Sequence, residues 1–317
     1  MMALEQQNGM TELSTLGLLS IKGLDAKTFL QGQVTCNLND ITPQKSLLGA
    51  HCNLKGRMQS IFRIFLDSHD KTSMHYYLCL PQPMLAIAQQ NFKKFALFSK
   101  VDITIATDLV GIGLYGTHAG KIHLEHDYDC VSKETKNGVC HISRIPGSIP
   151  RYELWGTKEV INQISSTIAS STQPVLPHIW ELLDIQAGIP TVYPSTIDQI
   201  LPHHANLSIL KGISYDKGCY LGQEIIARMQ YRGKIKKHMY RAFIQESDTL
   251  PVPGAQVVCE PFLDNEAPGM VVRASKTEHN GSELLIVLDE QYQHFENIRL
   301  YSADGPKVHR LDLPYRF

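Results

Sequence analysis

The 317-residue sequence lacks the features that mark several common protein classes. Only seven cysteines occur, at positions 36, 52, 79, 130, 140, 219 and 259, and no Cys-x-x-Cys pair is present. Their odd number and wide scatter argue against a disulfide framework or a zinc ribbon, and they suit a reducing compartment. A G-x-G-x-x-G or P-loop pattern is also missing, which argues against a doubly wound nucleotide-binding fold.

An excess of one charge and long hydrophobic runs are missing too. Thirty Lys and Arg against 31 Asp and Glu leave a formal charge of −1, so no global attraction to nucleic acid or to an anionic membrane is expected. Apolar runs such as residues 284–288 are far too short to span a bilayer. The first twenty residues contain neither Lys nor Arg, so we expect no secretory or transit peptide and a cytoplasmic protein.

Metal-binding patterns and tryptophan are scarce. The only adjacent pair among the fourteen histidines is His203-His204, and without H-E-x-x-H or a cysteine pair we expect no bound metal. Trp155 and Trp180 are the only tryptophans. We interpret Trp155 as a core residue of an apolar strand. Trp180 begins an amphipathic helix, where it could pack in the core or stack on a flat heterocycle.

The first 237 residues alternate strand pairs with helices, which predicts an α+β fold with mainly antiparallel sheets. Residues 1–12 are predicted to be loose. The spacing of apolar residues predicts strands at residues 16–21, 47–54, 60–66, 74–80, 101–106, 110–115 and within 139–156. It predicts helices after an N-cap at Asp25 and over residues 83–98, 158–170 and 179–186.

The last eighty residues differ from the rest of the chain in their pattern of apolar and turn-forming residues. Short β-rich runs lie at residues 240–245, 256–260, 270–275, 283–288 and 297–301, and turn pairs such as Pro253-Gly254 and Asn280-Gly281 separate them. This spacing predicts a small antiparallel barrel or sandwich. We therefore expect one region over residues 1–237, made of two α+β subdomains, and a C-terminal domain over residues 238–317.

The clearest chemical signal is the signature segment, residues 217–224, which reads Lys217-Gly218-Cys219-Tyr220-Leu221-Gly222-Gln223-Glu224. A helix is predicted to follow it, with an apolar face and a stop at Gly233, so that Cys219 would lie just before the first turn. A neighbouring ammonium group and a helix N-terminus both favour the reactive thiolate. A lone cysteine can equally be a small buried hydrophobe, and the residues alone do not choose.

Two basic stretches could bind anions. Lys55-Gly56-Arg57, the basic turn, joins two predicted strands. Residues 228–241 hold six cations and no acidic residue: Arg228, Arg232, Lys234, Lys236, Lys237 and Arg241. Either stretch could hold a carboxylate or a phosphate, and either could be a solvated face.

Taken together, the motifs resemble the YgfZ family of folate-binding proteins, bacterial relatives of the aminomethyltransferase (T-protein) of the glycine cleavage system. The resemblance covers nearly the whole chain. Besides the complete signature segment, the matching stretches are Phe29-Leu30-Gln31-Gly32-Gln33-Val34-Thr35, Lys55-Gly56-Arg57-Met58, Pro150-Arg151-Tyr152-Glu153-Leu154, Ala187-Gly188-Ile189-Pro190, Leu201-Pro202 with Asn206-Leu207, and Ala227-Arg228.

The resemblance implies a T-protein-like ring of three small domains around a tetrahydrofolate site, with a C-terminal β-barrel. It also implies a part in making or repairing iron–sulfur clusters in client enzymes, including those that thiolate tRNA. Trp180 matches a folate-contacting position, whereas Leu16 stands where the family has a second tryptophan. We expect the pterin against Trp180, the folate carboxylates toward Arg57 or the strip that begins at Arg228, and Cys219 at the rim of the cavity.

Three functions remain open at this point. The first is a folate-dependent cluster-maintenance factor in which Cys219 is the reactive thiolate and Lys217 its activating neighbour. The second is a one-carbon transferase, although Ser60 and Ile61 replace an acidic pair of T-proteins and residues 149–151 replace a Glu-Asp-Gly element, which removes the evident base. The third is a non-catalytic scaffold for apo-enzymes. We expect a monomer that binds neither nucleic acid nor membrane directly.

Overall fold

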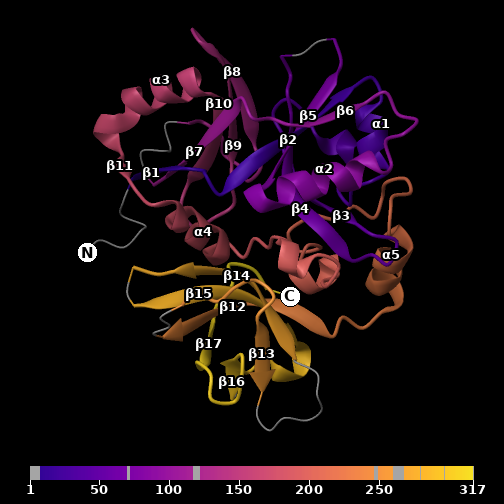
Figure 1. Cartoon of the computed structure of the whole chain (residues 1–317), viewed down its shortest axis with the longest axis vertical. Helices are drawn as coiled ribbons and strands as arrows, with labels where there is room; N and C mark the ends of the chain where they lie inside the picture. The colour runs from indigo at the N-terminus through magenta and orange to yellow at the C-terminus, as the bar shows by residue number, and fades with distance from the viewer. Residues whose placement is uncertain are drawn as a thin grey trace.

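The computed structural model describes residues 8–69, 72–116, 122–245, 249–259, 268–278, 280–295 and 297–316. Their strands form three sheets arranged around the centre of the folded molecule (Figure 1). The predicted α+β class with mainly antiparallel sheets is confirmed. One short exception exists: β1 pairs in parallel with β11.

The first sheet has the strand order β3-β4-β5-β2-β6. Its members are β2 (Leu16–Gly23), β3 (Leu47–Cys52), β4 (Met58–Leu66), β5 (Met74–Pro81) and β6 (Asp102–Ile105). Helices α1 (Ala26–Gln31) and α2 (Leu85–Lys93) pack against it. Along β2 successive side chains enter different cores: Leu19 and Ile21 join the large core, while Leu16 and Leu18 join a cluster shared with the second sheet.

The second sheet has the order β11-β1-β7-β10-β9-β8. Its strands are β1 (Gly9–Glu12), β7 (Leu109–Tyr115), β8 (Cys130–Thr135), β9 (Gly138–Arg144), β10 (Arg151–Thr157) and β11 (Gln173–Pro174). Helix α3 (Lys158–Ile168) packs against β10, and α4 (Pro177–Gln186) lies between this sheet and the third (Figure 1).

The third sheet has the order β16-β13-β14-β15-β12-β17 and curves toward closure, because Arg299 of β16 forms an isolated backbone β-bridge with Lys307, the residue before β17. Its strands are β12 (Lys237–Gln245), β13 (Gln256–Cys259), β14 (Gly269–Lys276), β15 (Gly281–Asp289), β16 (Ile298–Leu300) and β17 (Val308–Leu311). The predicted C-terminal barrel is therefore confirmed in outline. Helix α5 (Gln223–Arg232) precedes β12.

The structure corrects several local predictions. Residues 9–12 form β1 because β7 and β11 supply backbone partners that the polar sequence does not reveal, and residues 1–7 lie outside the described chain. Helix α2 ends at Lys93 instead of residue 98, and a tighter bond from the Phe95 amide to the Phe92 carbonyl closes it. Asp25 is the N-cap residue of α1 as predicted, but its side chain makes no capping bond to the helix, and its carboxylate accepts from the Lys100 amide at 2.7 Å instead.

Candidate functional site

The signature segment is held in place by two distant stretches of the chain. The Lys217 Nζ donates to the carbonyl oxygens of Val34 at 2.7 Å and Cys36 at 2.8 Å, and it lies 4.9 Å from the centre of the Tyr220 ring. The Leu221 amide donates to the Gly32 carbonyl at 3.1 Å. The platform on which the signature segment rests is therefore residues 32–36, which overlap the separate motif predicted at residues 29–35 and extend one residue beyond it.

Gly222 packs the signature segment onto the basic turn. Its φ of +81° lies in the left-handed region, and a Cβ at this position would stand 2.5 Å from the Asn53 carbonyl oxygen and 3.1 Å from the Gly56 Cα. Gly56 in turn has φ +70° and lies against Ile225 of α5. Two glycines from motifs far apart in sequence are therefore in direct backbone contact, which explains why neither position has room for a side chain.

Cys219 is presented to solvent by this arrangement. It is exposed, and an added Cβ at Gly218 would meet no atom within 4 Å. Helix α5 begins at Gln223 with Gly222 as its N-cap, so Cys219 precedes the first turn, as predicted, and lies three residues before the cap. The predicted stop at Gly233 is the C-cap.

The electrostatic surroundings of the thiol differ from the expectation. The Lys217 ammonium points to two carbonyls of the platform, and burial lowers the pKa of this lysine to about 8. Lys217 therefore anchors the segment. Within the described chain, its ammonium group makes no hydrogen bond to the Cys219 thiol. Gln223 Oε1 accepts from the Tyr220 amide at 3.4 Å. Glu224 and Arg228 are exposed on α5, and no ion pair joins them within the described chain.

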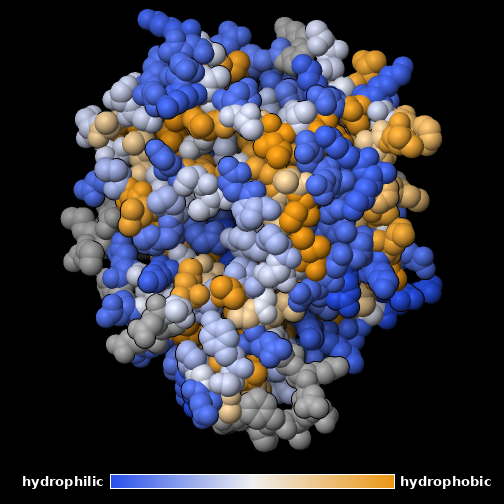
Figure 2. Space-filling view, in the orientation of Figure 1, coloured by the Kyte–Doolittle hydropathy of each residue, from blue (hydrophilic) through white to orange (hydrophobic). Residues whose placement is uncertain are grey.

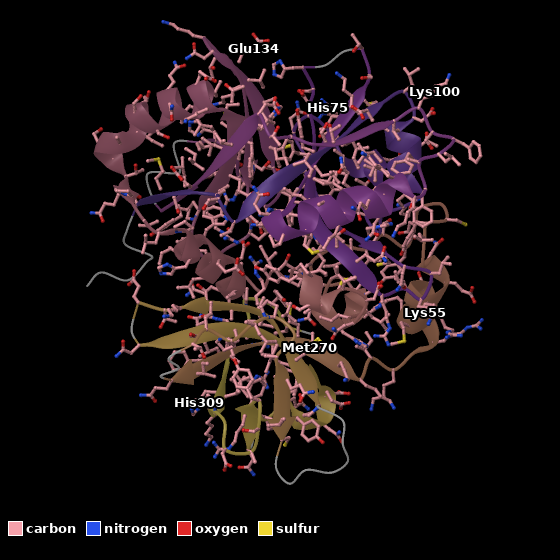
Figure 3. The ribbon with its side chains drawn as sticks, viewed as in Figure 1. Lys55, His75, Lys100, Glu134, Met270 and His309 are labelled. Carbon is pink, nitrogen blue, oxygen red and sulfur yellow. The ribbon has the colours of Figure 1, made fainter. Side chains whose placement is uncertain are left out.

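A hollow of about 540 Å³ opens beside the signature segment. Its lining residues are Asn53, Leu54, Lys55, Arg57, Gln59, Asn91, Lys94, Phe95, Asp198 and Leu221. Arg57 is oriented here by bonds from Nη1 to the carbonyls of Gln199, at 2.8 Å, and Asp198, at 3.4 Å. Figure 3 shows Lys55 at the side of the molecule occupied by α5.

Trp180 lies away from the signature segment and the hollow beside it. Figure 1 places α4, which carries it, between the second and third sheets, whereas α5 lies on the opposite side of the molecule. The Trp180 ring is 2% exposed, lies against Gly113, and donates from Nε1 to Glu153 at 3.3 Å. The residues predicted to bind folate, Trp180, Arg57 and Arg228, are therefore not brought together in one cavity.

Around Trp180 lies a set of six charged side chains, the central cluster, of which all but the partly buried Glu181 are buried. Its members are Arg63 (β4), Arg151 and Glu153 (β10), Glu181 and Asp184 (α4) and Arg273 (β14). Asp184 meets three arginines: Arg151 Nη2 at 2.8 Å, Arg273 Nη2 at 3.0 Å and Arg63 Nη1 at 3.7 Å. The three sheets and α4 thus meet in one balanced network of three positive and three negative groups.

The central cluster contains carboxylates but offers no base. Burial alone would raise the pKa of Asp184, but the neighbouring arginines outweigh it and lower that pKa to about 2. Glu153 is paired with the Arg63 guanidinium through Nη2 and, at 3.2 Å, through Nε. The gap beside the cluster, bordered by Leu16 and Arg63, measures only about 20 Å³, roughly the space of one water.

A much larger cavity shares Leu16 with that gap. It measures about 920 Å³ and lies between β1 and β7 of the second sheet, β2 and β6 of the first, and α3. Figure 2 shows this face of the molecule hollowed near its middle. Trp155 and Ile112 line it, and Trp155 Nε1 is buried without a partner in the described chain. Within the described residues 217–224, no side chain lines this cavity or the gap.

The sequence carried signals for both central features. Arg63 and Asp184 each interrupt an apolar run, and a charge in such a run indicates a buried partner. Leu16, the position singled out in the sequence analysis, is one of the residues that line the cavity. The packing of the sheets decides which charged side chains pair, and it decides that Trp155 lines the cavity while Trp180 does not. Local sequence patterns do not predict this packing.

Other classes of site are not indicated. No group of three or more His, Cys, Asp or Glu side chains in the described ranges is arranged to hold a metal ion. None of the helices that the structure describes is long and apolar enough to cross a membrane.

Comparison with known proteins gives consistent relatives. No model of a protein family matches the chain. The tRNA-modifying protein YgfZ of Colwellia psychrerythraea is 37% identical over 235 residues, 72% of this chain and 69% of that protein. The proteins of the same name from Photobacterium profundum and Escherichia coli SE11 are 32% and 28% identical and cover 96% of this chain, with 90% and 92% of their own lengths matched.

A solved structure shares the fold. The aminomethyltransferase T of the glycine cleavage system from Bartonella henselae superposes with a TM-score of 0.71, covering 98% of this chain and 86% of the other at 12% sequence identity. The predicted T-protein-like architecture is confirmed by this likeness, which concerns the fold alone.

Proposed function

Because the chain belongs to the YgfZ family, we propose that it is a folate-binding factor that supports tRNA modification by helping to build or repair iron–sulfur clusters in client enzymes. The observation that carries this proposal is the anchored signature segment, which presents Cys219 to solvent and so to another macromolecule. The relatives are named as tRNA-modifying proteins, and this supplies the link to tRNA modification. A single thiolate cannot hold a stable cluster alone, so Cys219 takes part transiently.

We place tetrahydrofolate in the 920 Å³ cavity, since its volume lies in the usual range for small-molecule sites and the 20 Å³ gap is too small. The apolar walls suit the pterin and benzoyl rings, and Trp155 is among the residues that line them. Lys158, exposed at the lining, is placed to receive a carboxylate of the glutamate tail. Trp180 then supports the second sheet beneath the site.

Tetrahydrofolate is expected to quench the fluorescence of wild-type protein mainly through Trp155. In Trp180→Phe the quenching should persist with a similar midpoint, whereas in Trp155→Phe it should disappear, because only Trp155 lines the cavity. Titration of both variants, each checked for an unchanged melting temperature, measures this. Loss of quenching in Trp180→Phe alone would return the ligand to the position predicted from sequence.

Replacing Cys219 by Ala is expected to abolish the support of tRNA thiolation in cells that lack the wild-type protein. The matched control is Cys259→Ala, another cysteine that is not fully buried, which should retain full support. Thiolated nucleosides are measured by mass spectrometry of bulk tRNA. Normal thiolation in the Cys219→Ala strain, at equal protein level, would show that the thiol has no part in the function.

Aminomethyl transfer is not favoured. The positions of the T-protein acidic pair hold Ser60 and Ile61, both buried on β4, and Arg151 occupies the third changed position. The nearby carboxylates of Glu153 and Asp184 are both tied to arginines, and those arginines lower the pKa of Asp184 to about 2.

A further inference from the structure

The hollow beside the basic turn has an uncompensated positive charge. Among its lining residues, Lys55, Arg57 and Lys94 are cationic and Asp198 is the only acid, so the formal balance is two positive charges. The Asp198 carboxylate is itself engaged, since its Oδ1 accepts from Asn53 Nδ2 at 2.8 Å. A ligand with two negative charges would complete the balance.

The three cationic side chains keep donor groups that the described protein does not use and that a ligand could therefore bind. Arg57 uses Nη1 for the two loop carbonyls, and no described residue accepts from its Nη2 or Nε. Lys94 is exposed and donates to Asn91 at 2.8 Å, and Lys55 is exposed without an ion pair in the described chain. A guanidinium held by one edge and offering the other is the usual arrangement for carboxylate or phosphate recognition.

The hollow also has an apolar wall. Leu54 and Phe95 line it, and they are 79% and 44% exposed, so they place accessible apolar surface beside the cations. An inorganic anion would leave this wall uncovered, whereas an anion joined to an aromatic or aliphatic body would cover it. Charge and shape together select an amphiphilic dianion.

We propose that this hollow binds a small dianion that carries an apolar or aromatic group, an aryl phosphate or an aryl dicarboxylate, and delivers it to the neighbourhood of Cys219. Leu221 of the signature segment lines the hollow, and two peptide steps place the Cys219 Cα at most about 7 Å from the Leu221 Cα. The hollow shares no lining residue with the proposed folate cavity. The proposal therefore stands or fails separately from the function proposed above.

The test uses the rate at which Cys219 reacts with two aromatic disulfides. Dithiobis(nitrobenzoate) is dianionic and dithiodipyridine is neutral; in each case the thiolate attacks the S–S bond, forms a mixed disulfide and releases one aryl thiolate. The rate in Cys219→Ala is subtracted to remove the contribution of Cys259. We expect Lys55→Ala and Lys94→Ala each to slow the dianionic reagent by about tenfold at low salt and to leave the neutral reagent unchanged.

Two further arms identify the ligand chemistry. Phenyl phosphate and N-benzoylglutamate are added as competitors at about 1 mM, and protection of Cys219 by one of them, or by both, supports the site and shows which anion it accepts. The control Lys133→Ala removes an exposed lysine of β8 that lies outside the hollow, and it should behave as wild type. Equal rates in Lys55→Ala, Lys94→Ala and Lys133→Ala, or no protection by either competitor, would overturn the proposal.

Discussion

Asp184→Asn is expected to lower the free energy of unfolding by about 3–5 kcal/mol, the usual cost of removing one partner from a buried ion pair. The amide keeps the shape of the side chain but leaves Arg63, Arg151 and Arg273 with two carboxylates instead of three. The loss follows from uncompensated buried charge and not from a cavity. Urea unfolding followed by circular dichroism measures it.

The matched control is Asp304→Asn, an exposed aspartate outside the central cluster, where the change should stay within about 0.5 kcal/mol. A pH series adds a second criterion. The folded pKa of Asp184, about 2, is below its unfolded value of about 3.9, so its contribution is present above the unfolded value and is lost as pH falls through the folded one. The difference between wild type and Asp184→Asn should therefore shrink between pH 4 and 2, and a constant difference would contradict this origin.

Gly222→Ala is expected to destabilise the protein by about 3 kcal/mol and to disorder the signature segment. Two penalties combine: a left-handed φ of +81° costs a non-glycine residue about 1–3 kcal/mol, and the new Cβ would meet the Asn53 carbonyl oxygen at 2.5 Å, where backbone has to move. Unfolding free energies, with tRNA thiolation in cells as the functional readout, measure both effects.

Gly218→Ala is the control from the same eight residues. Its Cβ would meet nothing within 4 Å and its φ is outside the left-handed range, so stability should stay within about 0.5 kcal/mol of wild type. If the two alanine variants lost stability equally, the contact between Gly222 and the basic turn would not be what holds the segment. Loss of thiolation in Gly218→Ala at normal stability would place a ligand directly against that backbone.

Local patterns predicted the parts of the fold that depend on neighbours in sequence. The stop of α5 at Gly233, the turn at Gly188 and the hairpin of β3 and β4 across the basic turn all follow from glycine placement and apolar spacing. The end of α2 did not, because Phe95 and the apolar residues after it continue the helical pattern but are exposed on the surface.

The candidate site was predictable in its residues but not in its geometry. The signature segment can be identified from its amino-acid sequence. Only the folded chain shows that Lys217 binds the carbonyls of residues 34 and 36 and that Gly222 packs on Gly56. Trp180 was assigned to a ligand face and is buried against Gly113. Each of these contacts joins residues more than sixty positions apart, and no spacing rule within one segment encodes them.

The central cluster also bears on the order in which the protein is made. Arg63, Arg151, Glu153, Glu181 and Asp184 leave the ribosome well before Arg273, so the emerging chain carries two positive and three negative members until β14, the third strand of the third sheet in chain order, has been synthesised. During that interval Glu181 lacks the bidentate partner that it has in the finished structure. Synthesis of β14 is therefore the step that completes the charge balance. The three sheets can join at the central cluster only late in synthesis of the chain.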